Sequence, residues 1–223
     1  MKIKAIFTDL DGTLLKNDHT VSEKVKEKFK ELEKKGVKIF ISTGRSFKSS
    51  YPFVKELDIK TPVITYNGGR IVDPVTEEVI YEKPVSKENV AKIIDISREK
   101  GIHLNLYSDD ELYIEKEDEE GTGYAKRVGI PYFLLNFDEF RGKTSTKGLF
   151  LADAEILTEL KKELEKELSD VNFVFSQPTY LEVLNKEVNK GLAVTEILKK
   201  YDISPDEVMA FGDQWNDLEM LKA

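Results

Sequence analysis

Short apolar runs that each end in a polar turn constrain the fold of this chain more than any other feature of its sequence. Three of them, residues 3–8, 37–41 and 63–65, lie near the N-terminus, and the segments between them have apolar residues at helical spacing. Such alternation is typical of a parallel sheet with crossover helices. The rhythm returns near the C-terminus, where we predict a helix over residues 190–201 and a strand over residues 208–211. An α/β core with a parallel sheet is therefore expected.

The first predicted helix carries signals at both of its ends. Thr20 and Glu23 have the spacing of a capping box, and Gly36 stands where a glycine commonly follows a helix. Its apolar residues recur at helical spacing, at Val21, Val25, Phe29 and Leu32. We predict a second helix over residues 47–57.

The middle of the chain has a different pattern. We predict a helix over residues 86–100 and interpret the acidic, glycine-containing stretch 115–123 as a loop. The segments 173–175 and 180–184 indicate a β-pair. A further helix has an apolar face formed by Ile156, Leu160, Leu164 and Leu168. This part of the chain therefore has the mixed order of an α+β unit.

The change of pattern predicts two domains rather than one. At about 150 residues per domain, a chain of 223 residues forms one large domain or two small ones. We interpret residues 1–81 and 189–223 as a discontinuous core, and residues 82–188 as an α/β domain inserted into it.

Composition excludes several kinds of chemistry. The chain has no cysteine, so it has no disulfide, thiolate zinc site or cysteine nucleophile, and it has only two histidines. A net charge of −8 argues against a nucleic-acid binder, and no run approaches the roughly 18 apolar residues of a membrane span. The N-terminus has no signal-peptide pattern. We expect a cytoplasmic protein, monomeric or homodimeric, whose chemistry depends on carboxylates, lysines and hydroxyls.

The candidate site is formed by residues that follow the predicted parallel strands, because ligands bind at the carboxyl ends of such strands. Carboxylates that converge without basic neighbours indicate a divalent cation, and hard oxygen ligands favour Mg²⁺. Lys190 opens a helix whose N-terminal N–H groups favour an anion. The residues at these strand ends are Asp9, Asp11, Thr43, Gly44, Arg45, Asn67, Gly68, Asp213, Asn216 and Asp217. Together they predict a magnesium-assisted phosphate site.

The same residues carry a family resemblance. The motif at residues 9–14, Asp-Leu-Asp-Gly-Thr-Leu, and the motif at 212–217, Gly-Asp-Gln-Trp-Asn-Asp, resemble those of the haloacid dehalogenase (HAD) superfamily of phosphatases. Ser-Thr-Gly-Arg at 42–45, Asn67-Gly68 and Asn189-Lys190-Gly191 resemble the Cof-like, type IIB branch. The resemblance implies a Rossmann-like core with an inserted α+β cap of type C2B.

The resemblance also implies roles for individual residues. Asp9 is expected to be the nucleophile that forms an aspartyl-phosphate, and Asp11 the general acid and base. Mg²⁺ is expected to bind the Asp9 carboxylate, the Asp11 backbone carbonyl and Asp213. Asp217 is expected to orient Lys190 or the metal waters. The residues expected to bind phosphate or substrate are Thr43, Gly44, Arg45, Lys190 and Asn216.

Three functions agree with these residues. The first is a Mg²⁺-dependent phosphomonoester hydrolase for small phosphorylated metabolites such as sugar phosphates. The second is a phosphohexomutase, since related capped proteins move a phosphoryl group between positions of a hexose. The third is a non-catalytic module that binds a phosphoryl group, against which Asp11 argues, because a signalling module needs no acid/base.

Other features have simpler interpretations. Asp-Gly and Asn-Gly are common in ordinary turns, and His19 and His103 are expected at the surface and in a strand of the inserted domain. Members of the branch continue past the last motif with another strand and helix, so the chain resembles a shortened member. Its strand 208–211 is then expected at a sheet edge.

Overall fold

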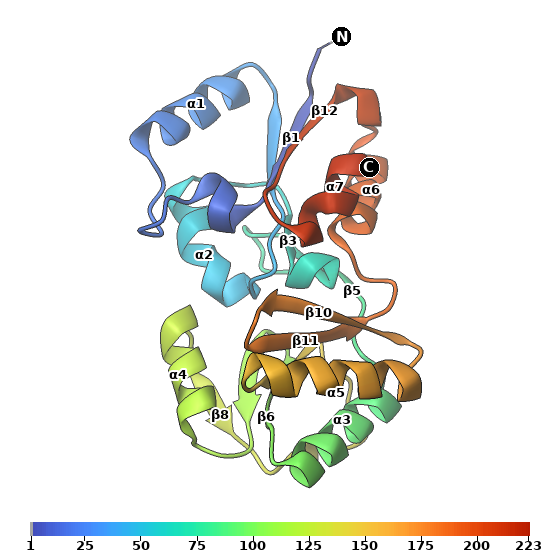
Figure 1. The fold of residues 1–223 in the computed structure, drawn as a ribbon. Helices are drawn as coiled ribbons and strands as arrows, with labels where there is room; N and C mark the ends of the chain where they lie inside the picture. The colour runs from blue at the N-terminus through green and yellow to red at the C-terminus, as the bar shows by residue number, and fades with distance from the viewer. Residues whose placement is uncertain (1) are drawn as a thin grey trace. The chain divides into compact units, whose positions relative to one another are not determined.

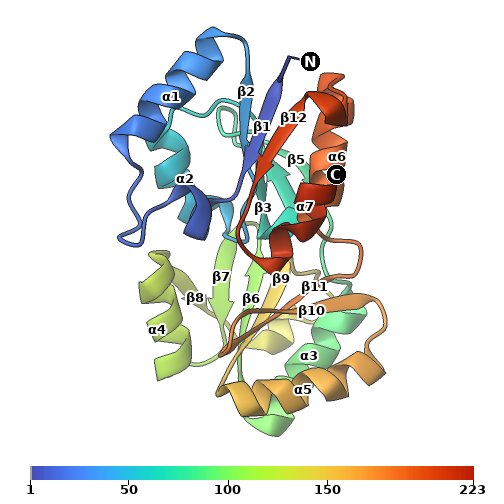
Figure 2. The same cartoon turned by 45° about the horizontal axis from the view of Figure 1, so that its top comes forward.

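The computed structural model describes residues 2–223, and the chain divides into two compact units (Figures 1 and 2). One unit contains the chain up to Glu82 together with Val188–Ala223, and the other contains Lys83–Glu187. Among the described residues, no helix combines the length and apolarity required to cross a membrane.

A parallel sheet organises the first unit. Strand β1 (Ala5–Thr8) pairs in parallel with β12 (Val208–Phe211) on one side and with β2 (Lys38–Ile41) on the other. A parallel bridge between Ser42 and Ile64 brings β3 (Val63–Thr65) beside β2. The predicted parallel α/β core is therefore confirmed, and β12 is an outer strand among residues 2–223.

Two short strands that the sequence pattern did not indicate continue this region in the antiparallel sense. β4 (Arg70–Val72) pairs with β3, and β5 (Val79–Glu82) pairs with β4. Antiparallel neighbours need only short connections, so the chain turns back directly after β3 without a crossover helix.

Helices cover both faces of the parallel sheet (Figure 2). α1 (Glu23–Lys34) and α2 (Phe47–Glu56) lie on one side, and α6 (Lys190–Tyr201) and α7 (Leu218–Lys222) lie on the other. Alternate residues of each strand face opposite sides. Ile39 and Ile41 of β2 therefore pack in the core with α1 and α2, whereas Phe40 packs in the core with α6 and α7. The sheet is consequently buried on both faces, as a parallel sheet requires.

The predicted cap of α1 is wrong by two residues. Ser22 is the N-cap, and its hydroxyl accepts a hydrogen bond from the backbone N–H of Val25. The hydroxyl and the backbone N–H of Thr20 instead bind Asp18, which forms a turn before the helix. Gly36 follows the helix with φ +80°, as predicted.

The second unit is built on a six-stranded sheet in the order β10-β11-β9-β6-β7-β8. All neighbours are antiparallel except β7 and β8. The bounds are β6 His103–Ser108, β7 Glu111–Ile114, β8 Tyr132–Leu134, β9 Lys147–Leu151, β10 Val171–Gln177 and β11 Tyr180–Asn185. α3 (Lys87–Lys100) and α5 (Ala154–Glu167) contribute to one core with this sheet. The predicted pairing of residues 173–175 with 180–184 is confirmed.

Two predictions in this unit are wrong. Helix α4 (Glu119–Val128) includes residues that we interpreted as a loop. Asp118 caps it by accepting a hydrogen bond from the N–H of Gly121, and Tyr124 and Ala125 are buried. In α5 the buried residue near the N-terminus is Leu157 rather than Ile156, which is 48% exposed. The other three residues of the predicted apolar face, Leu160, Leu164 and Leu168, are buried as predicted.

Candidate active site

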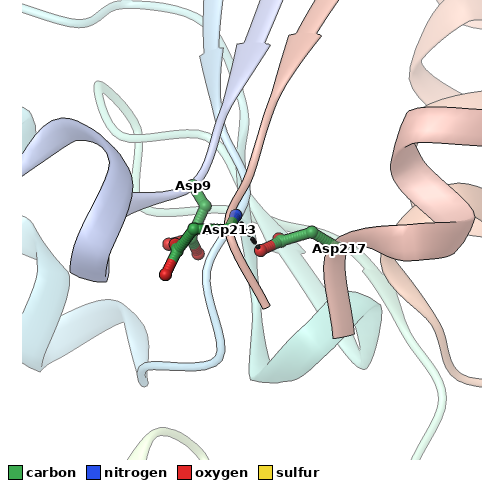
Figure 3. Close-up of side chains that lie close together, drawn as sticks. All are labelled: Asp9, Asp213 and Asp217. Carbon is green, nitrogen blue, oxygen red and sulfur yellow. Dashed lines mark hydrogen bonds between the residues drawn. The ribbon is translucent and has the colours of Figure 1, made fainter. Parts of the chain in front are cut away.

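Three aspartates meet at the carboxyl end of the parallel sheet (Figure 3). Asp9 follows β1, and Asp213 and Asp217 follow β12. Each offers a carboxylate oxygen, and these three oxygens lie within 4.8 Å of one another. The fold thus brings together carboxylates that are about two hundred residues apart in the sequence, at the strand ends where the sequence analysis expected a site.

Lys190 supplies a buried positive charge to this cluster. It is the first residue of α6, and its side chain is fully buried. Its Nζ lies 2.6 Å from Oδ1 of Asp9 and 2.6 Å from Oδ1 of Asp217. A buried ammonium requires such partners, because its desolvation is otherwise too costly.

Asp217 connects Lys190 to the loop after β12. Its second oxygen, Oδ2, accepts hydrogen bonds of 3.0 Å from the backbone N–H groups of Asp213 and Gln214. Figure 3 shows the bond from Asp213. A Cβ on Gly212 would collide with the Asp217 side chain, so glycine is needed at that position. Both oxygens of Asp217 are therefore occupied by protein donors, which suits a residue that orients its neighbours.

Burial and like charges perturb Asp9. Burial raises the pKa of Asp9 to about 6, against the lowering effect of Lys190, and the carboxylates of Asp217 and Asp11 add to the rise. The positive charge of Lys190 alone therefore does not balance this site. A further cation near Asp9 would favour its ionised form.

Asp213 is exposed and is held from both of its oxygens. Thr13 Oγ1 donates to Oδ1 at 2.7 Å, and Gln214 Nε2 donates to Oδ2 at 2.9 Å. Gly12 has φ +82°, and a Cβ there would collide with the Asp213 carboxylate. Thr13 was not among the predicted site residues. The signal was available, because Thr13 lies in the same turn as Asp11.

The turn after β2 is joined to the turn after β3. The N–H of Tyr66 donates to the carbonyl of Arg45, and the N–H of Asn67 donates to the carbonyl of Thr43. Thr43 is almost fully buried. Tyr66 and Asn67 have φ values of +52° and +57°, which are unusual for residues with side chains, above all for a tyrosine. Asn67 Oδ1 then accepts a hydrogen bond of 2.9 Å from Nδ2 of Asn216.

Arg45 binds Asp11 at two points. Its Nε lies 2.7 Å from Oδ2 of Asp11, and its Nη2 lies 2.5 Å from Oδ1. The guanidinium also lies over the ring of Phe53, 5.0 Å from the centroid. The structure therefore brings Arg45 against Asp11, a contact that the sequence analysis did not include.

The donor set fits the implied Mg²⁺. Asp9 and Asp213 offer hard oxygen ligands close together, and among residues 2–223 this aspartate cluster is the single group of acidic or histidine side chains with spacing suited to a metal ion. Burial is the main cause of the raised pKa of Asp9 and the nearby carboxylates add to it, so a bound divalent cation would favour the ionised form of Asp9.

Residues 6–223 match the family model described as haloacid dehalogenase-like hydrolase. The chain belongs to this family. The resemblance in the sequence motifs is thereby confirmed.

Several relatives of the HAD-like hydrolase family resemble the chain over nearly its whole length. The HMP-PP phosphatase of Yersinia pseudotuberculosis is 29% identical over 214 residues, which cover 96% of this chain and 78% of that protein. The crystal structure of TM0651 from Thermotoga maritima is 33% identical with a TM-score of 0.88, covering 98% of this chain and 82% of that one. The HAD subclass IIB sugar phosphatase BT4131 is 25% identical with a TM-score of 0.84, covering 98% and 84%.

These comparisons agree on a HAD-type phosphatase with a parallel core and an inserted cap that carries a mixed sheet. The predicted enzyme class and fold class are therefore confirmed, and the unit Lys83–Glu187 is the cap.

Proposed function

We propose that this HAD-family protein is a Mg²⁺-dependent phosphomonoester hydrolase for small phosphorylated metabolites, with sugar phosphates as the first class to test. The observation that carries the proposal is the position of Asp9: its carboxylate lies 2.6 Å from the buried ammonium of Lys190 and within 4.8 Å of Asp213 and Asp217. The names of relatives support the substrate class, since one is a sugar phosphatase and another an HMP-PP phosphatase.

We assign the nucleophile to Asp9. In the first step a carboxylate oxygen of Asp9 forms a bond to phosphorus while the bond from phosphorus to the leaving oxygen breaks, which leaves an aspartyl-phosphate. Asp11 gives its proton to the leaving oxygen in this step. In the second step Asp11 takes a proton from water, whose oxygen attacks phosphorus and releases Asp9 and inorganic phosphate.

We propose that the oxygens of the transferring phosphoryl group bind donors from three places: the turn after β2, the start of α6 and the segment after β12. Lys190 lies at the N-terminus of α6, and Thr43 and the N–H of Gly44 follow β2. Asn216 is held by Asn67, so its amide has a defined direction. Fixed donors of this kind stabilise charge that spreads over the phosphoryl oxygens. When bound, Mg²⁺ would be held by Asp9, the Asp11 carbonyl and Asp213, and would supply positive charge against the phosphoryl group.

The test is turnover with and without the metal. We expect p-nitrophenyl phosphate to be hydrolysed with Mg²⁺ and not with excess EDTA, and a panel of sugar phosphates to include better substrates. Asp9→Asn is the control for contaminating phosphatases. Release of inorganic phosphate identifies a hydrolase, whereas isomerised sugar phosphate without release identifies a mutase. No turnover of any phosphomonoester by well-folded protein would contradict the proposal.

A further inference from the structure

The two-point ion pair between Arg45 and Asp11 points to a role for Arg45 different from the phosphate or substrate binding expected from its motif. We propose that Arg45 is a positioning residue, which holds the acid/base carboxyl of Asp11 and does not bind the transferring phosphoryl group. This inference rests on the proposed function of the same site.

The side chain of Arg45 uses its two-donor edge on a protein carboxylate. The edge of a guanidinium formed by Nε and Nη2 presents two parallel N–H groups, and this geometry suits a carboxylate or a phosphate equally well. In this chain that edge lies on Asp11, at 2.7 and 2.5 Å. Because both N–H groups of this edge bind the Asp11 carboxylate, the edge does not offer a two-point contact to a phosphoryl group.

The surroundings of Arg45 fix the guanidinium in this position. One face lies over Phe53, and Nη1 lies 3.4 Å from the carbonyl oxygen of Ser49. The backbone N–H of Arg45 donates to the hydroxyl of Thr43, and its carbonyl accepts from Tyr66. The side chain is 22% exposed. Both ends of the residue are therefore held before any substrate binds.

The two hydrogen bonds from Arg45 give Asp11 its direction, whereas His19 Nδ1, the other ionisable group near the carboxyl, lies 3.8 Å from Oδ1 on an exposed side chain. The side chain of Asp11 is 44% exposed. The next residue, Gly12, has a positive φ and turns the chain. A carboxyl on such a turn is free to adopt several rotamers unless a partner selects one. The planar fork of Arg45 fixes the plane of the carboxyl as well as its position, which a lysine ammonium cannot do.

The contact also suits the proton transfer. Transfer of a proton between Asp11 and the leaving oxygen requires the carboxyl to keep one direction, and the two-point contact with Arg45 holds it there. Arg45 would thus favour the first step without touching the phosphoryl group. Its removal should be felt most with substrates whose leaving oxygen needs a proton.

The experiment compares Arg45→Met, which keeps length without charge, with Arg45→Lys, which keeps charge without the fork. Each is assayed with p-nitrophenyl phosphate, whose leaving group needs little acid help, and with glycerol phosphate, whose leaving group needs more. Inhibition by inorganic phosphate reports affinity for the phosphoryl group, and Thr43→Ala serves as the variant expected to lose that affinity. Asp11→Asn and the double variant Asp11→Asn with Arg45→Met complete a cycle.

We expect Arg45→Met to lower kcat on glycerol phosphate by about tenfold or more, up to the roughly 10²–10⁴-fold that general acid–base catalysis contributes in full, and to affect p-nitrophenol release less. Inhibition by phosphate should stay within about threefold of the parent, which amounts to less than about 1 kcal/mol of binding free energy. Arg45→Lys should recover part of the loss. The double variant should be no slower than Asp11→Asn, because the function of Arg45 is exercised through Asp11.

Three results would overturn the inference: a tenfold weaker inhibition by phosphate in Arg45→Met, equal losses on both substrates, or additive losses in the double variant. If Arg45→Met does not fold, Arg45→Lys carries the same comparisons. If the parent protein hydrolyses no phosphomonoester, the proposed function fails instead. Calorimetric titration with inorganic phosphate and Mg²⁺ then still decides whether Arg45 binds the phosphoryl group: equal affinity in parent and Arg45→Met supports that part of the inference, and a tenfold loss overturns the inference.

Discussion

The ammonium of Lys190 lies 2.6 Å from Oδ1 of Asp9, and this contact joins the end of β1 to the start of α6 across most of the chain. Lys190 also lies 2.6 Å from Asp217, so one buried positive charge serves two buried carboxylates. The contacts among Lys190, Asp9 and Asp217 stabilise the fold, and the negative charge of Asp217 remains close to Asp9. Unfolding measurements on variants of Lys190 and Asp9 test these two effects.

Removal of Lys190 should destabilise the protein strongly. Lys190→Met leaves Asp9 and Asp217 buried without their ammonium, and loss of one partner from a buried ion pair typically costs about 3–5 kcal/mol. Urea unfolding in EDTA measures this free energy. Lys199→Met on the same helix is the matched control, because the Lys199–Glu196 pair is exposed and should contribute less than about 0.5 kcal/mol. Equal losses in the two variants would mean that Lys190 does not stabilise the core charges.

Asp9→Asn should abolish turnover without loss of stability. The amide is not a nucleophile, and removal of a covalent nucleophile costs several orders of magnitude in rate. Because burial raises the pKa of Asp9 to about 6, the folded state binds the Asp9 proton more tightly than the unfolded state. Ionised Asp9 therefore destabilises the fold as pH rises above the unfolded value, and the neutral amide escapes this cost.

The measurement for Asp9→Asn is the melting temperature at pH 8 in EDTA, together with turnover in Mg²⁺. We expect the variant to melt no lower than the parent. Residual activity within tenfold of the parent, after contamination is excluded, would rule out Asp9 as the nucleophile.

Segments with clear local signals were predictable from the sequence. The helix Lys190–Tyr201 and the strand Val208–Phe211 have the predicted bounds, since Asn189 caps the helix and the strand is a short apolar run. Helix α4 was missed because Gly121 and Gly123 lower helix propensity. Burial of Tyr124 and Ala125 compensates for them, and packing of this kind is not visible in a local pattern.

The gathering of site residues at the strand ends followed from the parallel topology, whereas their individual contacts did not. Arg45 and Asp11 are 34 positions apart, and Asn67 and Asn216 are 149 apart. Motif spacing indicates which turns meet, but side-chain geometry decides which donor faces which acceptor. The motif therefore predicted phosphate or substrate binding by Arg45, and its contact with Asp11 was not predicted.

Asp213→Asn should weaken binding of Mg²⁺, because the amide is a neutral and poorer ligand than the carboxylate. Activity should fall at low magnesium and recover partly at high magnesium. Mg²⁺ should raise the melting temperature of the parent at pH 8, by mass action on the folded state, and raise that of the variant less. Asp206→Asn, outside the aspartate cluster, is the control. An unchanged magnesium dependence would remove Asp213 from the metal site.

Two substitutions of Asn67 separate its backbone role from its side-chain role. Asn67 has φ +57°, in the left-handed region. There an alanine Cβ costs about 1–2 kcal/mol of conformational free energy, whereas glycine adopts this conformation without strain. Both Asn67→Ala and Asn67→Gly lose the 2.9 Å hydrogen bond with Asn216, but only Asn67→Ala is strained. We therefore expect Asn67→Ala to be less stable than Asn67→Gly by about 1 kcal/mol in urea unfolding. Both should bind inorganic phosphate more weakly than the parent, because Asn216 loses the partner that directs its amide. Phosphate affinity equal to that of the parent in both variants would show that this hydrogen bond supports the turn and not the ligand.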